Sequence, residues 1–345
     1  MVEVIKQGIL LSPTQNDFES NGVLNPGIYQ EGNDVHIFYR AVEDGNFSTL
    51  GYARANGPTN IVERHQQPLI SIEFDYEKHG VEDPRIVKIE GTYYLTYTAY
   101  NGINAMGALA VSKDLIHFEK KGIFTPLINY REYKCHLEHC NQKKLNPKYY
   151  HYYNLFSSIG LVDEKHRLLR DKDVVLFPRK INGKFAMLHR IWPGIQIVYF
   201  EDWGHLTKPF WEEYLKDLTS HIVLDPKYDF EVKYLGAGCP PIETKEGWLL
   251  IYHGVCETTI GRTYHAAATL LQLDKPEIEI ARLPYPLFSP TEKWEKEGVV
   301  NHVVFPTGIV LFGDDLYIYY GSADNHIAVA QVNINELLSE LKEQS

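Results

Sequence analysis

The chain has few cysteines, no long hydrophobic run and no excess of basic residues. Its 4 cysteines among 345 residues follow no secretory signal, so we expect reduced thiols rather than a disulfide framework. The apolar run at residues 8–11 is far shorter than the core of a signal peptide, and no stretch approaches the length of a membrane span. These absences predict a cytoplasmic protein with no membrane partner.

The charge balance narrows the class of ligand. There are 34 basic and 45 acidic residues, a net charge of −11, and no basic stripe that would bind nucleic acid. An acidic surface with a few converging arginines suits a small anion held in a pocket. Aromatic residues make up 13% of the chain, with 24 tyrosines, which fits both β-sheet packing and sugar stacking.

One phrase occurs five times: a proline, a short apolar strand, a glycine and a second, aromatic-rich strand that ends in a polar residue. The copies occupy residues 25–40, 83–97, 177–190, 240–253 and 305–320. Repeats on this scale are typical of radial arrays, in which each unit buries its apolar face against its neighbours. The sequence therefore predicts an all-β fold, a five-bladed β-propeller.

The spacing of the repeats predicts a single domain over residues 1–345. The glycines that precede the second strands are residues 32, 91, 183, 247 and 313, and the longest interval, from 91 to 183, places an insertion between blades two and three. This insertion, at about residues 128–160, is rich in Tyr, His and Lys. We expect it to be irregular or partly helical and to act as a lid or as a contact in a homo-oligomer. Short helices are expected at 210–218 and, with Leu337, Leu338 and Leu341 on one face, at 335–342.

Polar residues recur at the points that a propeller gathers around its axis. First strands start near one mouth of the central funnel and second strands end near the same mouth. The residues at these points are Asn25, Asp83, Arg40, Arg190, His253 and Asp324, and Lys172, Asp173 and Lys233 precede two of the first strands. One acid, several cations and hydroxyl-binding groups would converge there. The pattern predicts an anion site beside a sugar site.

Six ordered motifs carry a resemblance to a known family. They lie at residues 80–86, 173–178, 188–190, 236–242, 247–255 and 319–324, and the match as a whole covers most of the chain, from about Asn25 to Asp324. In this set the chain resembles glycoside hydrolase family 130. That resemblance implies a five-bladed propeller and an inverting β-mannoside phosphorylase, with a minority of the family being β-mannoside hydrolases.

The resemblance also implies roles for individual residues. Asp83 matches the acid that protonates the glycosidic oxygen through the mannose 3-hydroxyl, while inorganic phosphate attacks the anomeric carbon from the opposite face. Phosphate is already an anionic nucleophile, so cations replace the base of the two-carboxylate scheme. The matching phosphate positions are Lys172, Arg190, Lys233, His253 and Tyr264, and the matching mannose positions are Asn25, Arg40, Arg54 and Asp324. Phosphate is then a co-substrate, and no metal or organic cofactor is expected.

Simpler readings compete for several of these residues. An Asp before a Pro is ordinarily a turn residue, and Arg40, Arg54 and Arg190 at strand ends could form structural ion pairs. His253 could be a buried core histidine. Glu82 is either a partner of Arg85 or a contact to the acceptor sugar, and the sequence does not choose.

Cysteines and histidines cluster at residues 135–140, in the insertion. Four soft ligands in six residues raise the possibility of zinc, but no second half of a site follows at finger spacing. A helical turn is the plainer interpretation. Cys239 and Cys256 are expected to be buried and inert.

Three functions stay open. The first is a phosphorylase acting on a β-mannoside, with β-1,2-mannobiose or a short β-1,2-oligomannoside favoured by the glutamate before Asp83 and by the long insertion. The second is an inverting β-mannoside hydrolase, which needs a second carboxylate about 6.5–9.5 Å from Asp83. The third is a noncatalytic sugar-binding propeller. A cation cluster without a base favours the phosphorylase, because unpaired cations in a cleft are costly without an anion.

Overall fold

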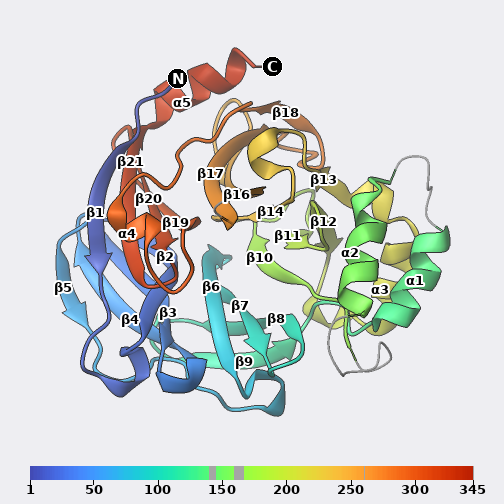
Figure 1. Ribbon diagram of the computed structural model, residues 1–345, viewed down its shortest axis with the longest axis horizontal. Coiled ribbons are helices and arrows are strands. Elements are labelled where there is room, and N and C mark those ends of the chain that lie inside the picture. The colour runs from blue at the N-terminus through green and yellow to red at the C-terminus, as the bar shows by residue number, and fades with distance from the viewer. Residues whose placement is uncertain (140–144, 159–166, 260, 345) are drawn as a thin grey trace.

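The computed structural model describes residues 1–139, 145–158, 167–259 and 261–344, and most of its regular structure is antiparallel β-sheet. The sheets surround a common centre, with strands β2, β6, β10, β14 and β19 nearest to it (Figure 1). Strands β2, β6 and β19 contain the start of the first, second and fifth copies of the repeat, whereas β10 and β14 end just before the third and fourth copies begin. The predicted β class is confirmed.

The largest sheet holds the first two repeats. Its strands are β2 (Gly22–Glu31), β3 (Asp34–Val42), β4 (Ser48–Asn56), β5 (Ile61–Arg64), β6 (Gly80–Ile89), β7 (Thr92–Tyr100), β8 (Ala105–Ser112) and β9 (Phe118–Ile123). A single parallel bridge between Ser48 and Gly80 joins β4 to β6. The sheet therefore consists of two four-stranded antiparallel units, one for each repeat.

The third and fourth repeats form separate sheets. One is built from β10 (Lys172–Leu176), β11 (Phe185–Arg190), β12 (Ile195–Phe200) and β13 (Ile222–Leu224). The other contains β14 (Tyr234–Ala237), β16 (Trp248–Thr258), β17 (Gly261–Leu271) and β18 (Glu279–Arg282), with the short β15 (Ile242–Glu243) paired to β16.

The fifth repeat is completed by the start of the chain. Strands β19 (Val304–Phe312), β20 (Asp315–Ser322) and β21 (His326–Asn333) follow the short helix α4 (Lys293–Lys296), and β1 (Ile5–Leu11) pairs antiparallel with β21. Helix α5 (Ile334–Lys342) ends the regular structure, with Leu337, Leu338 and Leu341 buried as expected.

The insertion between the second and third repeats is helical where it is described. Helices α1 (Tyr130–His139) and α2 (Lys148–Ser157) lie with α3 (Lys208–Lys216) outside the β10–β13 sheet (Figure 1). Tyr133, Tyr149, Tyr152 and Trp211 enter one large apolar cluster with that sheet. Cys140 of the proposed zinc cluster lies outside the described residues, and no group of three or more metal-ligating side chains occurs among the residues that are described.

Four of the repeats share a buried ionic triad that the sequence analysis missed. In each, a fully buried glutamate accepts a hydrogen bond from a tyrosine of the second strand and pairs with a cation of the outermost strand. The triads are Glu19–Tyr39–Arg64, Glu77–Tyr97–Lys120, Glu231–Tyr252–Arg282 and Glu295–Tyr320–Lys6. The cation of the fifth repeat comes from β1, so β1 occupies the place that β5, β9 and β18 occupy elsewhere.

Candidate active site

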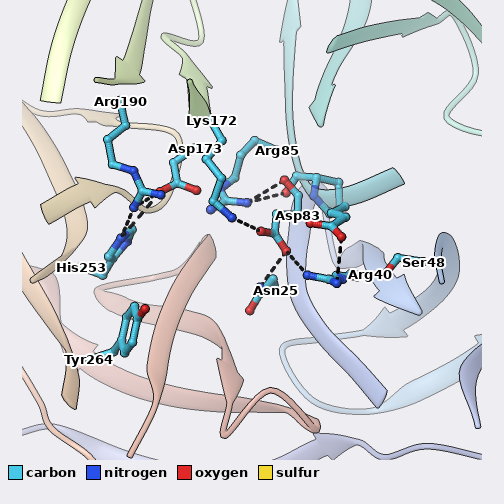
Figure 2. A network of polar contacts seen from close by, with 12 residues as sticks. Asn25, Arg40, Ser48, Asp83, Arg85, Lys172, Asp173, Arg190, His253 and Tyr264 are labelled. Carbon is cyan, nitrogen blue, oxygen red and sulfur yellow. Dashed lines mark hydrogen bonds and ion pairs between the residues drawn. The ribbon is translucent and has the colours of Figure 1, made fainter. Parts of the chain in front are cut away.

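Three site residues lie on β-bulges at the start of central strands. Asn25, Asp83 and Asp173 have φ of 49°, 50° and 58°, and the pairing register of β2, β6 and β10 shifts at each. Asn and Asp tolerate this left-handed conformation better than other residues with a side chain, because their short polar groups bond locally. A bulge turns a side chain out of the alternating pattern of the strand. The Asn25 and Asp83 side chains point toward each other in the central region, and Asp173 points toward Arg190 and His253 (Figure 2).

Asp83 lies in a ring of donors. Its Oδ1 accepts a hydrogen bond from Asn25 Nδ2 at 2.7 Å and lies 3.8 Å from Arg40 Nη1, and its Oδ2 lies 3.5 Å from Lys172 Nζ (Figure 2). Burial alone would raise the pKa of Asp83, but Lys172, Arg40 and the Asn25 amide outweigh it and lower the pKa to about 2. With this surrounding, and with no other molecule bound, Asp83 is ionised at neutral pH.

Glu82 pairs with Arg40, not with Arg85. Arg40 Nη2 lies 2.9 Å from Glu82 Oε1, and Arg40 Nε donates to Ser48 Oγ at 2.8 Å. Arg85 instead donates from Nε to the Gly238 carbonyl at 2.5 Å and from Nη1 to the Asp83 carbonyl at 2.9 Å. Burial raises the pKa of Glu82, and the positive charge of Arg40 offsets part of this rise.

A second ionic cluster joins the third and fourth repeats. Arg190 Nη1 lies 2.6 Å from Asp173 Oδ2 and 3.2 Å from His253 Nε2, and all three side chains are buried (Figure 2). Burial and the neighbouring guanidiniums of Arg190 and Arg85 hold the pKa of His253 well below its usual range. His253 is therefore neutral, and its Nε2 accepts from Arg190. Arg190 Nε is buried without a hydrogen-bond partner among the described residues.

Two adjoining cavities open next to these clusters. The first, of about 330 Å³, is lined by the cations Arg40, Arg170, Lys172, Arg190 and Arg262, by one described carboxylate, Glu82, and by the rings of Tyr100, Trp192, Tyr234, Tyr264 and Phe305. The second, of about 400 Å³, shares Arg40 and Asn46 with the first and is also lined by Asp324. Tyr264 contributes its hydroxyl, which lies 2.6 Å from that of Tyr234.

Most of the residues predicted from the sequence converge here. Asn25, Asp83, Arg40 and Lys172 form one network and Arg190 and His253 the other, while Tyr264 and Asp324 line the cavities. Burial raises the pKa of Asp324 to about 6, against the opposing effect of Arg40. Arg40, which lies 3.8 Å from Asp83 Oδ1, lines both the cation-rich cavity and the second cavity.

Arg54 does not join the others. Its guanidinium lies 3.1 Å from both Asp34 Oδ1 and Glu63 Oε2, in partly exposed ion pairs. Arg54 pairs in register with His36, four residues before Arg40 on β3, and a strand rises roughly 3.3 Å per residue. The strand direction therefore carries Arg54 away from Arg40, and the predicted mannose contact is wrong for this geometry.

Lys233 lies at the edge of the site rather than in it. Its ammonium pairs with Glu257, and it does not line the first cavity, whereas Arg262 does. The expectation that the cations are unpaired also fails, because Lys172 and Arg190 have Asp83 and Asp173 beside them. Even so, the five lining cations outnumber the four carboxylates near them, Glu82, Asp83, Asp173 and Asp324, which leaves a net positive charge.

The sequence analysis missed Arg170, Arg262 and the role of Asp173. Arg170 precedes Lys172 by two residues and Arg262 precedes Tyr264 by two, so period-2 alternation along a strand entering the site could have indicated both. Asp173 is the third-repeat counterpart of Asn25 and Asp83.

No helix of the described chain is long and apolar enough to cross a membrane.

Comparison with known proteins places the chain in a family. The glycoside hydrolase family 130 model, described as beta-1,4-mannooligosaccharide phosphorylase, matches residues 12–176 and 157–343. A 1,2-beta-oligomannan phosphorylase of Thermoanaerobacter sp. (strain X514) is 33% identical over 341 residues, 95% of this chain and 96% of its own. A beta-1,2-mannobiose phosphorylase of the same organism is 33% identical over 339 residues, 94% of each chain.

A solved structure agrees in fold. The beta-1,2-mannobiose phosphorylase of Listeria innocua, in complex with beta-1,2-mannobiose, superimposes with a TM-score of 0.72 at 22% identity and covers 99% of this chain and 100% of its own. The family model and both relatives extend over nearly the whole chain, including every residue of the two clusters. The chain therefore belongs to glycoside hydrolase family 130.

Proposed function

We propose that this protein catalyses the inverting phosphorolysis of a β-mannoside by inorganic phosphate, giving α-D-mannose 1-phosphate and the released sugar. The observation that carries the proposal is the first cavity, in which five cations face one lining carboxylate directly beside Asp83. A net positive charge remains after the carboxylates Glu82, Asp83, Asp173 and Asp324 are counted, which favours an anionic ligand such as phosphate. A positively charged cavity stabilises an anionic nucleophile such as phosphate, whereas a water nucleophile would need a carboxylate to act as its general base.

The favoured substrate is β-1,2-mannobiose or a short β-1,2-oligomannoside. Relatives named for β-1,2-linked substrates match over 94–95% of this chain, whereas the description of the family model names a β-1,4 linkage. We give more weight to the two long matches, because one family description covers members of several specificities. The second cavity, which adjoins the first at Arg40 and Asn46, offers room for further sugar units.

In this mechanism Asp83 is the general acid. Its proton reaches the glycosidic oxygen through the mannose 3-hydroxyl, as the family resemblance implies, while phosphate attacks the anomeric carbon from the opposite face. Asn25 holds Oδ1 of the Asp83 carboxylate by its 2.7 Å hydrogen bond, and Arg40 lies 3.8 Å from the same oxygen. Asn25, Arg40 and Asp324 then remain available to bind mannose hydroxyls.

Phosphate is held on the other side of the cavity. Arg190 and Lys172 face each other in register across β10 and β11, so one anion can accept hydrogen bonds from both. Tyr264 adds a hydroxyl donor, and Arg170 and Arg262 add positive charge. Neutral His253 orients Arg190 by accepting a hydrogen bond from Arg190 Nη1. Lys233, which pairs with Glu257 at the edge of the site, contributes only long-range positive charge.

The architecture proposed with this function is a five-bladed β-propeller closed by β1. It is supported by the five antiparallel units of four or five strands and by the glutamate–tyrosine–cation triad of four repeats, which in the fifth repeat uses Lys6 of β1. No metal or organic cofactor enters the proposed reaction. A cytoplasmic location and a homo-oligomer stay predictions from the sequence.

The test is sugar release from β-1,2-mannobiose with and without inorganic phosphate, assayed for mannose 1-phosphate. Phosphate-dependent formation of that ester, lost in Asp83→Asn, is the expected result. Free mannose without phosphate would favour the hydrolase, although Glu82 immediately precedes Asp83 on the same strand rather than facing it and Asp173 is paired with Arg190. An unchanged function in Asp83→Asn would instead favour noncatalytic sugar binding.

A further inference from the structure

A general acid must carry a proton when it acts, and the surroundings of Asp83 oppose this. Both carboxylate oxygens have a donor or a cation within 3.5 Å: Asn25 Nδ2 at 2.7 Å and Lys172 Nζ at 3.5 Å. Arg40 adds a second positive charge at 3.8 Å. Protonation of Asp83 in this arrangement would forfeit two ion pairs in a buried site.

Every element packed around Asp83 contributes to this balance. The titratable, charged and amide groups that face it are Asn25 of β2, Arg40 of β3, Glu82 and Arg85 of β6, Lys172 and Asp173 of β10, Arg190 of β11, His253 of β16 and Asp324 of the β20–β21 turn. Arg40 is shared with Glu82 and Arg190 with Asp173. Among the described residues, Lys172 makes an ion pair only with Asp83.

Lys172 is therefore the one cation that can change partner. It is part-buried, its 3.5 Å contact with Asp83 is loose, and its side chain lines the first cavity. It also stands opposite Arg190 across the β10–β11 pair. An anion bound between Lys172 and Arg190 would compete with Asp83 for the Lys172 ammonium and would add negative charge close to the carboxylate. Both effects favour the protonated form of Asp83.

We propose that phosphate binding loads Asp83 with the proton that it then donates, because the anion draws Lys172 away from the carboxylate. This inference rests on the proposed function and extends it: Lys172 acts as a positioning residue for the proton as well as a phosphate ligand. The free enzyme keeps Asp83 ionised and inactive as an acid. Only the phosphate complex is competent to protonate a β-mannoside.

The proton balance of the cycle is closed by phosphate itself. Phosphate entering as H₂PO₄⁻ gives one proton to Asp83, leaving HPO₄²⁻ and a neutral carboxylic acid. The bond between the anomeric carbon and the glycosidic oxygen breaks as a phosphate oxygen bonds to that carbon. The Asp83 proton ends on the hydroxyl of the released sugar, and Asp83 is again a carboxylate paired with Lys172.

The experiment uses sulfate, a dianion that does not titrate between pH 5 and 8. Isothermal titration calorimetry in buffers of different ionisation enthalpy gives the number of protons taken up when sulfate binds. We expect uptake in the wild-type enzyme that grows toward one proton per bound sulfate as the pH falls. Sulfate affinity should rise by up to about tenfold per pH unit over the same range. Asp83→Asn should bind sulfate with no linked proton.

Two variants separate the role of Lys172 from simple loss of charge. Lys172→Met removes the cation that holds Asp83 ionised, so the proton uptake on sulfate binding should shrink to less than half. Lys172→Arg keeps a cation that can change partner and should restore it. Uptake that persists in Asp83→Asn would assign the proton to His253, Glu82 or Asp324 and overturn the proposal.

Two further outcomes separate the loading of Asp83 from the proposed phosphorylase function. Sulfate binding without proton uptake in an enzyme that shows phosphate-dependent turnover would refute the loading of Asp83 and leave the phosphorylase intact. Failure of both sulfate and phosphate to bind would remove the anion site, and with it both the proposed function and this inference.

Discussion

At the scale of single residues, the site is a set of cations held beside carboxylates before any ligand arrives. Arg40 has Glu82, Lys172 has Asp83, and Arg190 has Asp173. A buried charge without a partner costs several kcal/mol, so this pairing stabilises the cations of the site. The remaining cations, Arg170 and Arg262, face the cavity, and the excess positive charge is left for an anion.

Arg190 is the residue through which phosphate binding can be tested most directly. Arg190→Ala removes a buried donor whose Nε has no partner in the described chain, and a hydrogen bond to a charged group contributes about 1.5–3 kcal/mol. We expect the phosphate KM to rise about 10- to 100-fold, with a much smaller change in the disaccharide KM. Steady-state kinetics with each substrate varied in turn measures both.

The matched control is Arg54→Ala. Like Arg190, Arg54 is an arginine on a β-strand. Its ion pairs with Asp34 and Glu63, however, are surface contacts away from the cavities. Exposed pairs contribute little, so neither KM should move. Equal weakening of phosphate and disaccharide in Arg190→Ala would contradict the role given to Arg190.

At the scale of elements, bulges on the central strands decide where the functional side chains go. The bulge at Asn25 is enclosed by β20: a Cβ added at Gly321 would lie 1.9 Å from Asn25 Oδ1 and 3.0 Å from the Asn25 backbone nitrogen. Only glycine leaves room for Asn25 to reach Asp83. A backbone position on one repeat thereby fixes a hydrogen bond to the acid on another.

Gly321→Ala should therefore impair the function of Asp83 and leave the phosphate-binding residues unaffected. The new methyl group displaces Asn25 and breaks its 2.7 Å bond to Asp83, so we expect kcat to fall about 10- to 100-fold. The phosphate KM should change less than threefold. Gly22→Ala is the control, since its Cβ would meet nothing closer than 3.4 Å. An unchanged kcat in Gly321→Ala would show that Asn25 does not support Asp83.

The insertion helices provide a test of stability against pH. Tyr149 of α2 donates to Asp225 Oδ1 at 3.1 Å, just after β13, and burial raises the pKa of Asp225 to about 6. An unfolded Asp titrates near 3.9, so the folded protein binds more protons between pH 4 and 6. The contribution of Asp225 to the free energy of unfolding therefore falls as the pH rises through this window.

Asp225→Asn should remove that pH dependence. Relative to the wild type, its free energy of unfolding should rise by up to about 3 kcal/mol between pH 4 and pH 7, since each pKa unit corresponds to roughly 1.4 kcal/mol. Urea unfolding at both pH values measures the difference. A constant offset between the two proteins at all pH values would mean that Asp225 titrates normally in the folded state.

The sequence predicted the elements better than the partners of each side chain. Repeated prolines and glycines located the central strands, and polar strand ends located Asp83, Arg190 and His253. Arg54 and Lys233 were misplaced, because their position depends on strand direction and on the carboxylates Glu63 and Glu257, which no local pattern reveals. Bulges were equally hidden, since an Asp-Pro or Asn-Pro pair fits many turns.

At the scale of the whole molecule, the repeated triad of glutamate, tyrosine and cation joins the second and outermost strands in four of the repeats. Asp-Phe-Glu at 17–19 and 229–231 and Asp-Tyr-Glu at 75–77 supply the buried glutamate in three repeats, and this recurrence was present in the sequence. In each, an outer-strand cation neutralises the glutamate. The fifth repeat takes Lys6 from β1, so the two ends of the chain meet in one sheet and one ion pair.

Lys6→Met tests whether the ion pair with Glu295 stabilises the sheet in which β1 pairs with β21. Lys6 Nζ lies 2.5 Å from Glu295 Oε2 and 2.8 Å from the Ser289 carbonyl, and Glu295 is fully buried. Removing one partner of a buried pair leaves an uncompensated charge, and because Lys6 is slightly exposed we expect a loss of about 2–3 kcal/mol. Thermal unfolding should start several degrees lower, while the phosphate KM at 25 °C stays unchanged because Lys6 lies outside both cavities.

Gln7→Met is the matched control for this prediction. Gln7 is the next residue on β1, but its side chain is exposed and bonds only to Gln331 of β21 among the described residues. The same change to methionine there should leave the unfolding temperature within about one degree, because surface substitutions rarely alter stability by more than 0.5 kcal/mol. Lys6→Arg should recover most of the loss by restoring a cation to Glu295. An equal loss in Lys6→Met and Gln7→Met would assign the effect to strand pairing and not to the Lys6–Glu295 ion pair.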